Sequence, residues 1–200
     1  NGGTDPVFQL QGANNANQHT FHISAAINAQ NNPGSIVFSK SRDNTLNGNT
    51  ILQNGDRIGE IIFCGADGTD RNPIAGKICA DVDGTPGSND MPGRLEFHTT
   101  GDGADSSTER ARITSTGYLL VGKNAVGTAE GCSLHPEGQG QFIRDQGVPL
   151  VVQRNGDDGD VVKIQQAGSV EGTISVSGTT VSYNGFTGGH WSRLVDNSKP

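Results

Sequence analysis

Short stretches of alternating apolar and polar residues recur along the chain, separated by clusters of glycine, aspartate, asparagine and proline. Alternation with a period of two is typical of a β-strand with one buried face, and the clusters are typical of turns. The pattern predicts strands at Gly34–Lys40, Arg57–Cys64, Ala75–Val82, Arg94–Thr99, Glu109–Thr114 and Tyr118–Val121. No stretch of convincing length has a helical period. We therefore expect an all-β chain of short antiparallel strands and hairpins, arranged as a meander or sandwich.

Two glycines mark the predicted hairpin turns. Gly117 is expected to supply the positive φ that a turn needs before the strand that follows it. Gly168 follows Ile164 at the same distance at which Gly117 follows Ile113. We interpret this as a weak internal repeat of strand, glycine turn and returning strand, which suits an elongated stack whose units contact mainly their neighbours.

The pattern divides the chain into four parts. Residues 1–30 are rich in Asn and Gln and are expected to be an N-terminal extended segment, with Thr20–Ser24 as an edge strand or linker. Residues 31–122 form the first predicted β module. Residues 123–147 lose the alternation and carry frequent glycine, which predicts a connector. Residues 148–200 form the second predicted β module.

Composition favours strands but predicts a thin core. Only 32% of the 200 residues are hydrophobic and 30 are glycine, whereas Ile and Val number 27 against 10 for Leu and Met. A glycine-rich chain loses much backbone entropy on folding and must bury enough apolar surface to offset that loss. Ile58–Cys64 is apolar on both faces after Glu60, which predicts burial on two sides. We expect another chain to provide the second side.

A resemblance to known proteins is carried by the stretches GRLEFHTT, DGADSSTERARIT and STGYLLVG within Gly93–Gly122. This segment resembles a module of bacteriophage tail fibres and tail spikes, those of marine phages especially. Pro149–Asn184 resembles the segment that such fibres place just before a C-terminal intramolecular chaperone domain, and Thr50–Gly87 continues in the same style. The likeness covers roughly residues 31–200, and the order of the motifs carries more weight than any one of them.

The resemblance implies an elongated homotrimer that is a structural virion protein acting in host attachment. It implies as partners other phage tail or baseplate proteins and a host surface glycan or protein. The expected location is the virion, after assembly in the host cytoplasm. It also implies a chaperone domain beyond these 200 residues. Because Met91 is the one methionine, we expect Asn1 to be a processing point or the edge of a longer protein.

Charge and hydropathy restrict the partners. The net charge is −7 and the pI about 5.1, so nucleic acid and anionic membrane surfaces would repel the chain. No stretch is long and apolar enough for membrane insertion or a signal peptide.

Thiols and imidazoles give no ligand pattern. Cys64, Cys79 and Cys132 are odd in number and lack metal spacing, which favours free thiols. His19 and His22 are closely spaced, but an i, i+3 pair on a regular strand points to opposite faces. We expect no transition-metal site and no cofactor.

Three acidic clusters leave calcium as an alternative to plain turns. They contain Asp67 and Asp70, Asp81 and Asp83, and Asn155, Asp157, Asp158 and Asp160, each beside glycine. None completes an EF-hand loop, so we favour aspartates that hydrogen-bond their own backbone.

No catalytic arrangement stands out. Glycoside cleavage needs two acids flanking the bond, and no pair is singled out here. One Trp and two Tyr offer few aromatic faces to a sugar, and no Gly-x-Ser-x-Gly elbow occurs. We expect a non-enzymatic protein. A polysaccharide-degrading tailspike, and a capsid fibre or other trimeric surface adhesin, remain alternatives.

Trp191 lies between His190 and Arg193 in a glycine-rich stretch. It could contact a receptor, but a lone Trp near the end of a β module is more often a plug between chains. The sequence therefore assigns no receptor-binding residue.

Overall fold

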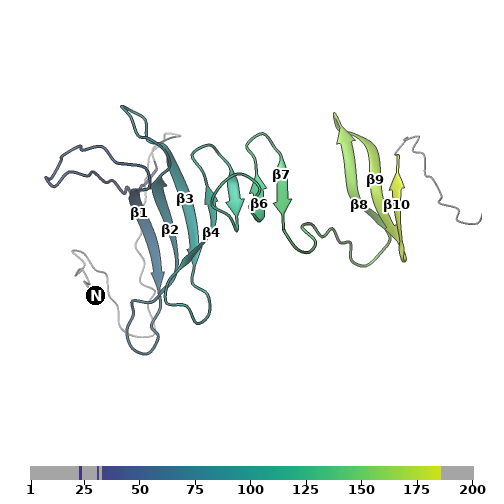
Figure 1. The fold of residues 1–200 in the computed structure, drawn as a ribbon, viewed down its shortest axis with the longest axis horizontal. Coiled ribbons are helices and arrows are strands. Elements are labelled where there is room, and N and C mark those ends of the chain that lie inside the picture. The colour runs from purple at the N-terminus through teal and green to yellow at the C-terminus, as the bar shows by residue number, and fades with distance from the viewer. Residues whose placement is uncertain (1–22, 24–30, 32, 186–200) are drawn as a thin grey trace, which may run out of the picture. The chain divides into compact units, whose positions relative to one another are not determined.

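The computed structural model describes residues 23, 31 and 33–185, and every structural statement below concerns these residues. The described chain is all-β: it contains ten strands and no helix. The strands pair in the orders β1-β2-β3-β4, β5-β6-β7 and β10-β9-β8, each with antiparallel neighbours (Figure 1). The expected fold class is confirmed at this level. Contacts divide the chain into residues 1–115 and 116–200, which we describe separately.

The described part of residues 1–115 contains four strands joined by loops. Their bounds are β1 Arg57–Cys64, β2 Ile74–Val82, β3 Gly93–Thr99 and β4 Thr108–Ile113. These agree with the predicted strands to within one residue at each end. The predicted strand Gly34–Lys40 is wrong, because these residues join no strand ladder. Three consecutive apolar residues do not explain this, since β1 has them too, at positions 61–63. A strand also needs a neighbouring strand to pair with, and the local residue pattern does not provide one.

The described part of residues 116–200, which ends at residue 185, contains six strands. Their bounds are β5 Leu119–Val121, β6 Gly131–Leu134, β7 Gly140–Ile143, β8 Gly159–Gln166, β9 Ser169–Ser177 and β10 Thr180–Asn184. Residues 123–147, which the sequence predicts to be a connector, contain the short strands β6 and β7. Each has only four residues and begins with glycine, so neither is long enough to display a period of two. The boundaries predicted for the two modules stay predictions.

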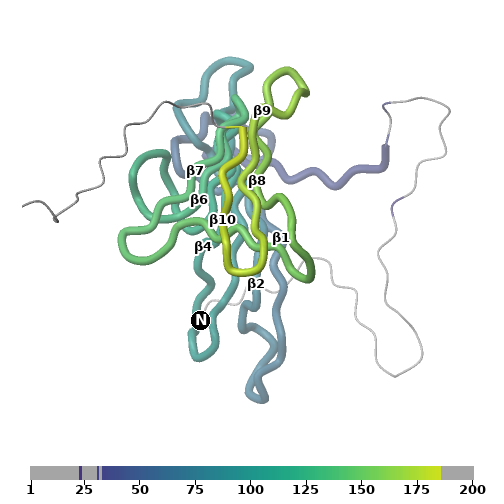
Figure 2. Tube along the Cα trace, turned by 90° about the vertical axis from the view of Figure 1, so that its right-hand side faces the viewer, coloured from purple at the N-terminus to yellow at the C-terminus, as the bar shows by residue number. Residues whose placement is uncertain are grey.

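The glycine turns are confirmed. Gly117 has φ of 85° two residues before the start of β5, and Gly168 has φ of 87° between β8 and β9. Ala167 also has a positive φ, 49°, so both residues of this two-residue loop are left-handed, as a type I′ hairpin requires. Gln166 pairs with Ser169 across the loop. The reversals around β9 can be followed in Figure 2.

The hydrophobic core of the single chain is small. Among the described residues, the buried hydrophobic side chains are Leu52, Cys79, Val82 and Leu120. The segment before β1 lies along the end of β2, where Gly55 N donates to the Val82 carbonyl and Val82 N donates to Asp56 O. The burial on two sides expected for Ile58–Cys64 is not reached within one chain, because the second half of β1 is exposed.

Candidate functional site

Strands β1–β4 have two chemically different faces, which follow from the strand register. The charged face carries Arg57, Glu60, Lys77, Cys79, Asp81, Arg94, Glu96, His98, Glu109 and Arg112, with Ile62 at its edge. The apolar face carries Gly59, Ile61, Phe63, Ile78, Ala80, Leu95, Phe97, Ala111 and Ile113. We keep these two names below.

Two β-bulges shape the charged face. The register shifts between Arg57 and Gly59 in β1, so one extra residue separates Arg57 from Glu60. A matching shift in the β3–β4 pair leaves Arg110 as the extra residue between Glu109 and Arg112. A bulge places two residues opposite one, so residues three apart then share a face. This is why Arg57 bonds Glu60 at 3.0 Å and Arg112 bonds Glu109 at 2.6 Å within single strands.

An ion-pair ladder crosses the strands at one end of this face. Arg57 of β1 donates to both carboxylate oxygens of Asp81 in β2, from Nε at 2.9 Å and Nη2 at 3.3 Å. Arg94 of β3 approaches the same Asp81 at 3.4 Å and also contacts Asp83. Bidentate arginine–carboxylate contacts fix geometry as well as charge. The ladder therefore ties three neighbouring strands together.

Glu96 is the centre of the charged face. It is buried, yet its Oε1 accepts from Arg94 Nε at 2.6 Å and from Arg112 Nη2 at 3.3 Å. Its Oε2 lies 3.0 Å from His98 Nε2 and 3.9 Å from Cys79 Sγ. Arg57 Nη2 approaches Oε2 at 3.7 Å. One carboxylate thus joins residues from all four strands.

The electrostatics of this face follow from burial and pairing. Burial by itself raises the pKa of Glu96, but the hydrogen bonds from Arg94 and His98 and the nearby guanidinium charges outweigh it, so the net pKa is lowered. The pKa of Asp83 is lowered in the same way, because hydrogen bonds from Ser115 outweigh burial. Burial raises the pKa of the Cys79 thiol. The carboxylates are therefore held ionised and the thiol protonated.

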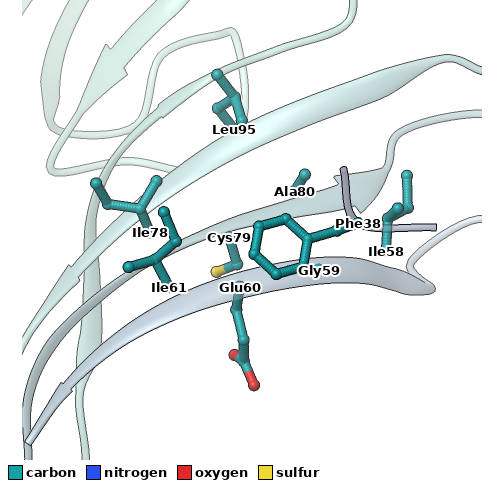
Figure 3. A pocket seen from close by; sticks show the side chains of 9 residues that line it. All are labelled: Phe38, Ile58, Gly59, Glu60, Ile61, Ile78, Cys79, Ala80 and Leu95. Atoms are coloured by element: carbon teal, nitrogen blue, oxygen red, sulfur yellow. The ribbon is translucent and has the colours of Figure 1, made fainter. Parts of the chain in front are cut away.

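The apolar face is uncovered in the single chain. Ile61, Phe63 and Leu95 are exposed by 49%, 56% and 44%. A groove of about 230 Å³ opens on this face, with Phe38 over Gly59 and the Glu60 carboxylate directed away (Figure 3). A Cβ built on Gly59 would lie 2.5 Å from Phe38 Cβ, so only glycine permits this contact.

Exposed apolar faces recur in residues 116–200. In β5–β7 the register places Val121, Leu134 and Phe142 on one face, and all three are exposed, while Leu120 and Ser133 are buried on the other. In β8–β10 the face with Ile164 also carries Val181 and Tyr183, again exposed. The opposite face of that sheet carries Asp160, Lys163, Thr173, Ser175, Ser182 and Asn184.

The acidic clusters divide between turns and ion pairs. Asp67 Oδ1 accepts from Thr69 N at 2.7 Å and from Asp70 N at 3.0 Å, so the turn interpretation is confirmed here. It is wrong for Asp81, which is a buried strand residue in the ion-pair ladder.

The third cluster supports the β8–β9 sheet. Asp157 pairs with Arg154 at 2.8 Å. Asp158 accepts from Ser177 Oγ and Gly178 N, both at 2.9 Å, and these bonds lower its pKa. Asp160 is a residue of β8. The three aspartates therefore serve different contacts and do not converge on one point through these bonds.

The remaining singled-out residues separate into two groups. Cys64, Cys79 and Cys132 are free thiols, and of these Cys79 is buried. His19, His22 and Trp191 lie outside the described residues. The described part of the chain has no helix long and apolar enough to cross a membrane.

Sequence reasoning missed the charged face. The Arg110-Ala111-Arg112 alternation indicates one solvated strand face, yet the Arg112 side chain is only 13% exposed. The available signal was the run Arg94-x-Glu96-x-His98 in β3, in which three ionisable residues share a strand face, together with one acid in each neighbouring strand, Asp81 and Glu109. Pattern alone did not show that their partners would be cross-strand arginines.

Comparison with models of known protein families and with curated protein sequences finds no match. The functional assignment below therefore depends on the chain's own residues and on the resemblance that its motifs carry.

Proposed function

We propose that this chain is a structural, non-enzymatic segment of a homotrimeric phage tail fibre or tail spike, which acts in host attachment. Three copies would associate through the apolar faces. The fibre would join other tail or baseplate proteins in the virion and bring its tip to a host surface glycan or protein. The number three and the virion role come from the motif resemblance, while the self-association has physical support in the fold.

The supporting observation is the uncovered apolar face of β1–β4. Monomeric soluble proteins rarely leave large contiguous apolar patches in water, and such patches usually mark interaction sites. Here Ile61, Phe63, Leu95 and Phe97 share one sheet face, and each is more than a third exposed. Burying this surface lowers the free energy of the assembly.

A second copy of the same chain is the occupant we favour. The small core of the described residues leaves each chain short of apolar burial, as is common in obligate oligomers whose folded monomer is marginal. In a closed symmetric oligomer, the same apolar face is buried in every copy. The aspartate-rich turns already use their carboxylates for hydrogen bonds to neighbouring backbone, which favours a structural role for them over catalysis.

The test is native mass spectrometry of the wild-type chain and of Ile61→Asp. We expect a wild-type trimer that survives dilution and a variant that dissociates, because an aspartate would bury an unpaired charge at the interface. Ile51→Asp is the matched control, since Ile51 is exposed to a similar degree but lies before β1, off the apolar face. A compact wild-type monomer, or equal loss of trimer in both variants, would contradict the proposal.

The non-enzymatic part is tested separately. Incubation with host capsule or lipopolysaccharide should leave glycan size unchanged. Time-dependent shortening that disappears on replacing a single carboxylate, such as Asp67 or Asp157, would show a depolymerase.

A further inference from the structure

The charged face brings together a thiol, an imidazole and a carboxylate that the proposed fibre role does not use. Cys79 in β2 is the cross-strand partner of Glu96 in β3, and His98 lies two residues further along the same face of β3. One ligand atom from each of the three residues lies within 4.8 Å of the other two. Cys79 and Glu96 are buried, and the His98 side chain is 11% exposed.

Two of the three distances between ligand atoms are close to those around a small metal ion, and the third is below 4.8 Å. Zinc takes sulfur at about 2.3 Å and nitrogen or oxygen at about 2.0–2.2 Å in tetrahedral geometry, so neighbouring ligand atoms lie about 3.3–3.8 Å apart. His98 Nε2 is 3.0 Å from Glu96 Oε2, and Cys79 Sγ is 3.9 Å from the same oxygen. Shifts of a few tenths of an ångström would bring both distances into that range.

The arginines leave one carboxylate oxygen for such an ion. Arg94 and Arg112 both bond Glu96 Oε1, whereas Oε2 faces His98 and Cys79. The nearest guanidinium contact to Oε2 is Arg57 at 3.7 Å, longer than a hydrogen bond. Oε1 of Glu96 therefore bonds the arginines, whereas Oε2 faces the Cys79 thiol and the His98 imidazole.

The charges on this face also suit a divalent cation. The connected ion pairs join five carboxylates to three guanidiniums, which leaves two negative charges. Lys77, whose cross-strand partner is His98, reduces this to one. A thiolate at Cys79 restores it to two, which a divalent ion neutralises.

One polar atom of the cluster has no partner. The buried His98 Nδ1 makes no hydrogen bond to any described residue. Nδ1 is not the nitrogen that faces Glu96, so the partner that this buried atom lacks would be a separate group such as a water, and an ion beside Glu96 would be bound through Nε2 alone. The imidazole is thus held through Nε2, the nitrogen that faces Glu96.

We propose that Cys79, Glu96 and His98 bind one divalent zinc ion per chain, with water as the fourth ligand. The ion cross-links β2 to β3, and the burial of its ligands favours a structural role over a substrate-binding one. On binding, the Cys79 thiol loses its proton to solvent and the sulfur lone pair coordinates the metal. Affinity should therefore rise with pH. This inference is independent of the proposed fibre function.

The probe is Co(II), which replaces zinc and reports thiolate coordination by a near-ultraviolet charge-transfer band. The parent protein is the full chain with Cys64→Ser and Cys132→Ser, which leaves Cys79 as its only cysteine. We expect the band to saturate at one Co(II) per chain, to disappear when Zn(II) is added, and to strengthen between pH 6 and pH 8. Zinc should also raise the melting temperature of this parent.

Variants locate the ion. Adding Cys79→Ser should abolish the charge-transfer band, and His98→Gln should weaken Co(II) binding at least tenfold. His135→Gln is the control, because His135 is the other described histidine and lies against Tyr118 instead. Melting of each variant without metal checks its folding, with Cys79→Ala replacing Cys79→Ser if the serine variant fails to fold.

Three results would overturn the proposal. The parent could show no thiolate band with Co(II) at pH 8. The band could survive in a folded Cys79 variant. His98→Gln could bind Co(II) as tightly as His135→Gln does. Failure of trimer formation in mass spectrometry would leave this metal test unaffected.

Discussion

Replacing Glu96 by Gln removes one negative charge from the centre of the charged face while keeping the size of the side chain. In the wild-type chain, Glu96 pairs with Arg94 and Arg112 through one oxygen and with His98 through the other. Glutamine can still accept a hydrogen bond, but it cannot offset the guanidinium charges. Arg94 would keep its contacts with Asp81 and Asp83, and Arg112 would keep its pair with Glu109.

The expected loss in the free energy of unfolding follows from how deeply this ion pair is buried. Glu96 and Arg94 have side chains that are 5% and 14% exposed, so this pair belongs with buried rather than surface ion pairs. Breaking a buried pair by removing one partner costs about 3–5 kcal/mol. Asp83 and Glu109 still pair with Arg94 and Arg112, so we expect the lower end, about 3 kcal/mol. Glu60→Gln is the control: its side chain is 34% exposed and contacts only Arg57, which predicts about 0.5 kcal/mol.

Hydrogen exchange measured by mass spectrometry reports this loss locally. At about 1.4 kcal/mol per factor of ten, 3 kcal/mol corresponds to roughly a hundredfold faster exchange in β2 and β3. Peptides from β9 serve as the internal reference. Protection of β3 within threefold of wild type, or no difference between Glu96→Gln and Glu60→Gln, would refute the central role assigned to Glu96.

The same difference should depend on pH. Because the folded-state pKa of Glu96 is lowered, its carboxylate contributes stability that is fully present above the unfolded pKa of about 4.3. That contribution is lost as the pH falls through the lower folded-state value. The wild type should therefore approach Glu96→Gln in stability below about pH 4. A difference that stays constant from pH 7 to pH 3 would contradict this.

Two further predictions concern turns. Gly168→Val should lower the free energy of unfolding by about 2 kcal/mol because φ is 87° there, and Gly117→Val should have a similar effect. Gly65→Val is the control, because Gly65 has surroundings as open as those of Gly168 but no positive φ, so this variant should lose little stability. Equal melting of the Gly168 and Gly65 variants would argue against the hairpin. Asp158→Ala should speed exchange in the β9–β10 loop, whose Gly178 N it caps; exchange there equal to wild type would assign that carboxylate no role.

The sequence was informative where structure is local. Strand β1 was predicted with its observed bounds, and the turns at Gly117 and Gly168 were placed correctly. In each case the cause lies within a few residues: a period of two, or a backbone conformation that favours glycine. The four-residue strands β6 and β7 were missed because a period of two needs more length to appear.

The charged face could not be predicted because it depends on register. In a regular strand, Arg57 and Glu60 would point to opposite faces, and so would Glu109 and Arg112. Only the two bulges bring each pair to one side, and each bulge is defined by the neighbouring strand. The position of Cys79 beside Glu96 and His98 could not be predicted for the same reason, because it arises from the register in which β2 pairs with β3.

The two faces of β1–β4 reverse the usual division of buried and exposed groups. Glu96 and Asp81 are shielded, while Ile61 and Phe63 face solvent in the single chain. Ion pairs are directional, so the charged face can satisfy its groups within one chain and set the register of the strands. Hydrophobic attraction is non-directional, so the apolar face gains stability only when another surface covers it. A sheet ordered by its own ion pairs would therefore present a preformed apolar face, so the self-association that we propose would lose less conformational entropy.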